Sequence, residues 1–142
     1  MIEKKVLLTI SGIQTFQEEA PETTKLVTEG KMKLEGDTVL LSYEESELTG
    51  LAGTQTAFSV RPDKVILTRT GAVNSKMTFV VGQEDHSLYD MGFGALMIAV
   101  RTEKICSELD KNGGFLQVLY SIVIEDDTAG TIEYQIEVRP KP

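Results

Sequence analysis

The chain is poor in the residues on which covalent and metal chemistry usually depend. Its 142 residues include one cysteine, one histidine and no tryptophan. The single cysteine, Cys106, cannot form a disulfide within the chain, and one histidine with one cysteine cannot supply the ligands of a typical zinc site. No calcium-loop motif of the Asp-x-Asp-x-Asp-Gly type is present either. We therefore expect no bound metal and no cofactor.

Positive charge and long apolar runs are also scarce. Fourteen Lys and Arg residues stand against 22 Asp and Glu residues, so the net charge is -8 at pH 7 and the pI is near 4.7. Such a surface repels phosphate backbones and anionic membranes, and we expect neither nucleic acid nor membrane as a partner. The longest apolar run, residues 95–100, is too short to cross a bilayer, and the first residues lack the apolar core of a signal peptide. We expect a cytoplasmic protein.

The chain is rich in β-branched residues. Val, Ile and Thr make up 37 of its 142 residues, and these side chains pack well on pleated sheets but lose rotamer freedom in helices. Apolar and polar residues alternate over 26–35 and again over 131–139, where Ile132, Tyr134, Ile136 and Val138 share one face. A period of two is typical of strands with one buried face. We therefore predict an all-β protein and place no domain boundary within residues 1–142.

Gly, Asn, Asp and Pro residues separate the predicted strands at short intervals. We place strands at 4–11, 26–35, 38–45, 54–61, 64–70, 75–81, 86–93 continuing through Gly94 into 95–109, 115–124 and 131–139. Residues 13–24 are interpreted as a long loop that covers one end of the fold. Gly92 and Gly94 are interpreted as a bend within one coiled strand, and Gly113 with Gly114 as a hairpin turn.

Many hairpin-linked strands with one apolar face each must pack as two sheets or close on themselves. The connections of about two to six residues suit up-and-down order better than Greek-key crossovers. We predict a single closed antiparallel β-barrel of about eight to ten strands, and a β-sandwich is the alternative.

Short motifs spread over nearly the whole chain resemble those of one protein family. They are Ser11-Gly12-Ile13-Gln14, Glu29-Gly30, Tyr43-Glu44-Glu45, Thr54-Gln55-Thr56, the run 65–71, Met77-Thr78-Phe79, the run 89–94, Val100-Arg101-Thr102 and Leu119-Tyr120. In order and spacing they resemble the YwiB-like family of uncharacterised bacterial β-barrel proteins, also called domain of unknown function 1934. The resemblance implies a lipocalin-like (calycin-like) barrel and no assigned activity. The chain departs from the family pattern at residues 90–94, and it lacks the Gly-x-Trp signature of true lipocalins.

Charged residues at strand positions that are expected to be buried are the most informative feature for function. If odd-numbered positions point inward, Arg69 on one strand and Glu45 on another both enter the barrel. A buried guanidinium is costly unless it is paired, so we expect Glu45 as its partner, with the hydroxyls of Tyr43 and Tyr120 completing a buried network. This network is either a structural ion pair that closes one barrel mouth or a site that recognises an anion. If even-numbered positions are buried instead, Arg69 lies in solvent.

Other reactive residue types have simpler interpretations. His86 lies in a polar stretch, and we expect it to be exposed. Cys106 is interpreted as a small buried hydrophobe, because it has the parity of Ile98 and Val100. The acidic group Glu44, Glu45 and Glu47 is typical of a solvated strand end, although paired carboxylates also serve glycosidases. We therefore name no catalytic residue.

Two main hypotheses for function follow, and they differ in what fills the barrel. The first is a barrel that binds a small molecule in its interior, with an anion among the candidate ligands. The second is a filled barrel that acts as a structural or protein-interaction module, with a homodimer among its expected forms. A cavity above roughly 300 Å³ lined by Arg69 and tyrosines would favour the first. An enzyme is a third hypothesis, which a network of Arg69 and Glu45 open to solvent in a cleft would favour.

Overall fold

The computed structural model describes residues 2–16, 20–46, 51–90, 94–124 and 127–141. Over these residues it forms ten strands and no helix. The strands are β1 (Ile2–Phe16), β2 (Glu22–Glu35), β3 (Thr38–Glu44), β4 (Thr54–Val60), β5 (Val65–Gly71), β6 (Asn74–Phe79), β7 (Glu84–Asp90), β8 (Ala95–Asp110), β9 (Gly113–Ile124) and β10 (Asp127–Pro140). No helix in the described residues is long and apolar enough to span a membrane.

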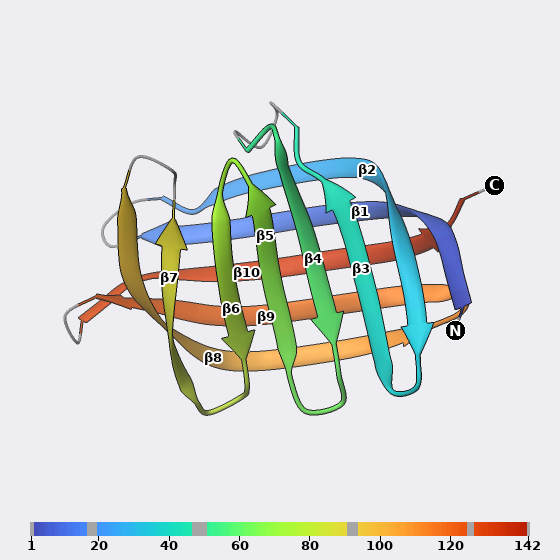
Figure 1. The fold of residues 1–142 in the computed structure, drawn as a ribbon. Helices are drawn as coiled ribbons and strands as arrows, with labels where there is room; N and C mark the ends of the chain where they lie inside the picture. Colours follow the sequence, from blue (N-terminus) through green and yellow to red (C-terminus); the bar gives the residue numbers. More distant parts are fainter. Residues whose placement is uncertain (1, 17–19, 47–50, 91–93, 125–126, 142) are drawn as a thin grey trace.

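The strands close into an antiparallel barrel. Each strand pairs with the next along the chain, and β1 also pairs with β10, with Val6 opposite Pro140 and Phe16 opposite Gly130 (Figure 1). Closure leaves no free sheet edge between the first and last strands. The prediction of an up-and-down barrel is confirmed, and the β-sandwich alternative is wrong.

The barrel is flattened into two layers whose strands cross at a steep angle. In Figure 1, β3 to β7 run across the front while β1, β9 and β10 lie behind them, and the long strands β2 and β8 each bend from one layer into the other. Gly30 lies within β2, just before the segment that pairs with β3. A Cβ atom there would lie 2.6 Å from both Leu8 Cδ1 and the Ser42 carbonyl oxygen. The absence of a side chain lets three strands approach closely at this corner.

Strand β8 contains a β-bulge that reverses its inward parity. Its register with β9 shifts between Thr102 and Lys104, so Glu103 is an extra residue. Val100 and Thr102 are buried before the bulge, whereas Ile105 is the partly buried residue after it. Cys106 therefore points outward and is exposed, so the prediction of a buried cysteine is wrong.

Two predicted connections differ from those in the structure. Residues 13–16 and 22–24 are not a loop, because β1 and β2 continue as a long hairpin with Ile13 opposite Thr23 and Gln14 opposite Glu22. Residues 86–93 and 95–109 do not form one strand either. Strands β7 and β8 pair antiparallel, with Asp90 opposite Ala95, and residues 91–93 between them lie outside the described residues.

The hairpin between β8 and β9 is confirmed, and its glycines are required by backbone geometry. Gly113 and Gly114 have φ angles of 102° and 134°. A Cβ atom on Gly114 would lie 1.7 Å from the carbonyl oxygen of Glu108. Only glycine fits this position without moving the backbone.

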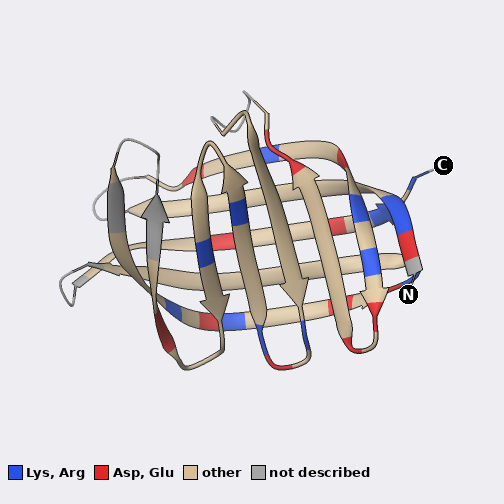
Figure 2. Ribbon diagram, in the orientation of Figure 1, with Lys and Arg blue, Asp and Glu red and all other residues tan. Residues whose placement is uncertain are grey.

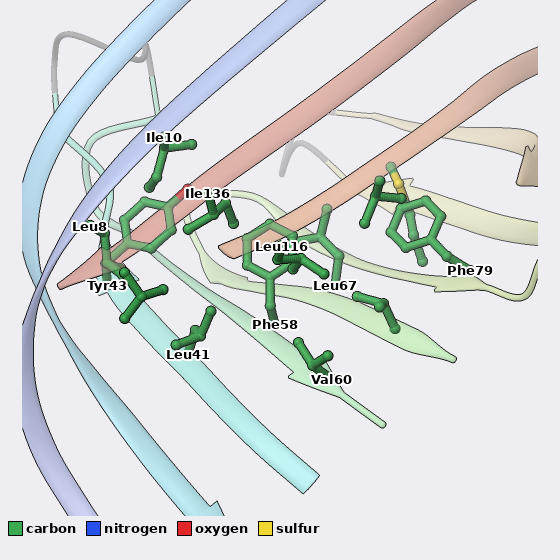
Figure 3. Close-up of a cluster of buried hydrophobic side chains, with 14 of the residues drawn as sticks. Leu8, Ile10, Leu41, Tyr43, Phe58, Val60, Leu67, Phe79, Leu116 and Ile136 are labelled. Carbon is green, nitrogen blue, oxygen red and sulfur yellow. The ribbon is translucent and has the colours of Figure 1, made fainter. Parts of the chain in front are cut away.

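Apolar side chains fill one part of the barrel. Figure 3 shows Leu41, Phe58, Leu67 and Leu116 among a packed group of side chains from several strands. Each of these four side chains is at most 1% exposed. Figure 2 marks the positions of the charged residues along the ribbon, and most of those in the described chain are exposed or partly buried. Among the described residues, only Glu45 and Arg69 are both charged and buried.

In the described chain, β6 and β7 share fewer residue pairs than any other neighbouring strands of the barrel. Only Asn74 with Asp90 and Ser75 with Tyr89 pair across this boundary in the described chain. Further along, the Thr78 backbone N–H donates to a carboxylate oxygen of Asp85 at 3.3 Å instead of to a carbonyl group. The barrel is therefore closed, but it has one weak seam.

Candidate functional site

A cavity of about 560 Å³ occupies the part of the barrel that the core leaves unfilled. Its wall combines apolar side chains with a small number of polar ones, which is typical of small-molecule sites. The ends of β1 and β2, the end of β3, and parts of β5, β6, β8, β9 and β10 contribute to it. The lining residues that matter below are Ile10, Tyr43, Glu45, Arg69, Met77, Ile98, Tyr120, Ile132 and Tyr134.

Strand register places a row of polar side chains on the inner face of β3 to β6. Tyr43 pairs with Thr56, Thr56 with Arg69, and Arg69 with Ser75. All four side chains are buried, with at most 8% of each residue exposed. Residues that lie directly opposite each other in paired strands point to the same face of the sheet, so the inward-facing positions line up across β3, β4, β5 and β6. The prediction that Arg69 and Tyr43 point inward is confirmed.

Arg69 is buried without a carboxylate partner. Its Nη2 donates a hydrogen bond to the Tyr134 hydroxyl at 3.0 Å, while its Nε has no partner. Glu45 is buried beside the same cavity, but no ion pair of 4.0 Å or less joins it to Arg69 in the described chain. The predicted ion pair between Arg69 and Glu45 is therefore wrong, and Tyr134 takes the position that we expected for Glu45.

Tyrosine side chains surround the guanidinium. Burial opposes the charge of Arg69, whereas the proximity and hydrogen bond of Tyr134, together with Tyr120 and Tyr43, raise its pKa above the ordinary value. Apart from that hydrogen bond, neutral phenols bring no negative charge to the guanidinium, so they do not replace a carboxylate near neutral pH. Arginine side chains stay protonated in proteins, so Arg69 is a cation. The cavity wall holds a fixed cation.

Glu45 is tied to the strand that lies between Tyr43 and Arg69. Its Oε1 accepts a hydrogen bond of 2.8 Å from Thr56 Oγ1, and its backbone N–H donates to the Thr54 carbonyl at 2.8 Å. Its second carboxyl oxygen, Oε2, is buried and has no partner. Burial, followed by the nearby Glu45 carboxyl group, raises the pKa of Tyr43, so the Tyr43 phenol stays protonated.

Aromatic rings connect the cavity to the filled core. Tyr120 stacks on Tyr134 with ring centroids 6.3 Å apart, and it also contacts Phe79 at 4.7 Å. The prediction that Tyr120 is buried is confirmed, since 2% of it is exposed. Tyr134 was not among the predicted site residues. The alternation of apolar and polar residues around Tyr134 indicated that its side chain points inward. Its contact with Arg69 crosses the barrel, and nothing in the sequence indicated that contact.

The remaining candidates lie away from this site. His86 is exposed as predicted, and its nearest charged partner is Glu84 at 3.8 Å. Glu44 is exposed, and Glu47 lies outside the described residues. No group of three or more His, Cys, Asp or Glu side chains in the described residues is arranged to hold a metal ion. The cavity thus offers a cation, a carboxyl group and phenols, which are groups that recognise a polar ligand.

Comparison with known proteins places the chain in a family. Residues 8–136 match the family described as domain of unknown function DUF1934. The chain belongs to this family. The resemblance that the sequence motifs indicated is therefore confirmed.

A similar protein of known structure shares the barrel. The chain is 30% identical over 106 residues to the "Uncharacterized beta-barrel protein YwiB" of Bacillus subtilis, which covers 75% of this chain and 73% of that protein. The crystal structure of the ywiB protein from Bacillus subtilis superimposes with a TM-score of 0.87 and 24% sequence identity over 99% of this chain and 94% of that one. This likeness supports the fold, and the barrel agrees with the lipocalin-like architecture implied by the resemblance.

Proposed function

We propose that this barrel binds a small molecule with a negatively charged group in its cavity, with Arg69 as the residue that anchors that group. The observation that carries the proposal is a buried cation with no carboxylate partner on the wall of a cavity of about 560 Å³. Taking an arginine out of water costs several kcal/mol, and a structural role would normally return that energy through an ion pair. A negative group on a ligand would supply the missing partner.

The dimensions of the cavity support the same proposal. Its volume exceeds the roughly 300 Å³ at which a lumen becomes a ligand site instead of a packing defect. The packed core lies next to the cavity, and Ile10, Ile98 and Ile132 form part of its apolar wall. The alternative, a completely filled barrel acting only as a structural or interaction module, requires a packed lumen and is less well supported. The compartment we propose is the cytoplasm, which suits an exposed free thiol such as that of Cys106.

Native mass spectrometry of protein freshly purified from a cell extract tests this proposal. We expect an additional bound mass on the wild-type protein that is lost from Arg69→Gln but retained by Arg101→Gln. Arg101 is the matched control because it lies on the surface and pairs there with Glu84 at 3.2 Å. Absence of any bound mass, or its retention by Arg69→Gln, would contradict the proposal. The same spectrum reports whether the protein is a homodimer.

A further inference from the structure

Two buried polar atoms of opposite kind lack partners on the cavity wall. Arg69 Nε is a hydrogen-bond donor without an acceptor, and Glu45 Oε2 is an acceptor without a donor. Both residues are more than nine-tenths buried and both line the cavity. An unsatisfied buried polar group is costly, and such groups in a folded protein require an explanation. A single anion would provide a partner for Arg69 Nε but not for Glu45 Oε2.

The two groups lie on either side of one residue, Thr56. The backbone of Thr56 is opposite Arg69 in the register of β4 with β5, and its hydroxyl donates to Glu45 Oε1 at 2.8 Å. Tyr43 is opposite Thr56 in the register of β3 with β4, and its side chain lines the same cavity as Glu45 and Arg69. The cation and the carboxyl group are therefore neighbours on one wall that do not pair with each other.

Apolar side chains complete the surroundings of this wall. Met77 and Ile98 are at most 6% exposed and line the same cavity, as does Ile132. A ligand whose polar head reaches Arg69 and Glu45 would place its remaining atoms against these three side chains. The cavity thus combines one compact polar corner with an apolar remainder.

We propose that the ligand is amphoteric: a negatively charged group contacts Arg69, an N–H donor or ammonium group contacts Glu45, and an apolar body fills the rest of the cavity. A free amino acid with an apolar side chain has this chemistry, since its carboxylate and ammonium groups share one carbon atom. Such a head presents one negative and one positive group, which match the guanidinium and the carboxyl group on the cavity wall. The inference rests on the proposed function and makes it more specific.

Matched sets of small molecules test the inference by isothermal titration calorimetry. One set is L-phenylalanine, 3-phenylpropionate, which lacks the ammonium group, and 2-phenylethylamine, which lacks the carboxylate. The second set is L-leucine, 4-methylpentanoate and 3-methylbutylamine. In at least one set we expect the amino acid to bind the wild-type protein about tenfold or more tightly than either partial analogue, as the loss of one charge-assisted hydrogen bond predicts.

Protein variants test whether Arg69 contacts the carboxylate of the amino acid and Glu45 its ammonium group. Glu45→Gln should remove the advantage of the amino acid over its deaminated analogue, and Arg69→Gln should weaken binding of both acids about tenfold or more. Glu84→Gln, at an exposed site, should change neither. A cooperative thermal transition for each variant shows that it is folded, and Arg69→Lys replaces Arg69→Gln if that variant is not.

The outcomes separate this inference from the function on which it rests. If the acids bind as tightly as the amino acids and Glu45→Gln has no effect, the ligand is a simple anion and the amphoteric inference is wrong, while the proposed function stands. If none of the six compounds binds, the inference is again wrong, and the bound mass in native mass spectrometry decides the proposed function alone. Tighter binding of the amines than of the amino acids would overturn both.

Discussion

Replacing Arg69 with methionine should stabilise the protein. Methionine has a similar length, so it fills the same space against the tyrosines without a charge. The substitution removes the hydrogen bond to Tyr134, worth about 1.5–3 kcal/mol for a charged donor. It also removes the desolvation cost of the buried cation, several kcal/mol, and the unsatisfied Nε, which costs about 1–3 kcal/mol.

The difference favours the variant because no carboxylate within 4.0 Å offsets the charge in the described chain. We expect the free energy of unfolding to rise by about 1–3 kcal/mol. For a domain of this size the melting temperature should rise by roughly 2–10 °C. A gain of this kind is expected where a protein retains a costly group for binding instead of stability.

Differential scanning calorimetry and urea unfolding, both without added ligand, measure this change. Arg101→Met is the control, because Arg101 is half exposed and its surface ion pair contributes little. The control should stay within about 0.5 kcal/mol of the wild type. A melting temperature for Arg69→Met that equals or falls below that of the wild type would show that the structure compensates the charge fully, and the main argument for a ligand would be lost.

Three further predictions concern the fold and its pH dependence. Because burial and a neighbouring carboxyl group raise the pKa of Tyr43, the unfolded chain loses that proton above about pH 10 while the folded chain keeps it. Stability should therefore fall as pH rises above that value, and Tyr43→Phe should reduce this loss in urea unfolding. Gly114→Ala should cost about 3 kcal/mol or more, against about 1 kcal/mol for Gly82→Ala, where φ is also positive but nothing lies within 4 Å. Leu67→Ala should cost about 2–5 kcal/mol by thermal unfolding, whereas Val27→Ala, 58% exposed, should change little.

Alternation in the sequence was sufficient to predict the barrel where a strand has one dry face. In β10, Ile132, Ile136 and Val138 are buried as their period of two indicates. The pattern failed where the barrel departs from regular pairing. The extra residue Glu103 reverses parity within β8 without any change in composition, so Cys106 was placed on the wrong face. All side chains of residues 13–16 and 22–24 are exposed or only partly buried, because this hairpin extends past the filled core, and the segment therefore carries little apolar pattern.

The same reasoning explains what could be predicted of the site. Parity is a local property, so the burial of Arg69, Glu45, Tyr43 and Tyr120 was predictable from each strand separately. Contacts across the lumen depend on strand tilt and stagger, which no single strand determines. For that reason Tyr134, not Glu45, is the partner of Arg69. The role of these residues in ligand binding stays a prediction.

The weak boundary between β6 and β7 has a consequence for how the molecule fluctuates. The other neighbouring strands are joined by five or more residue pairs, whereas in the described residues two pairs and one carboxylate of Asp85 join β6 and β7. Local opening should begin at this boundary, and the amides of Thr78 and Phe79 should exchange with deuterium faster than those of the long hairpin of β1 and β2. During folding, we expect β6 and β7 to be the last neighbouring strands of the barrel to pair.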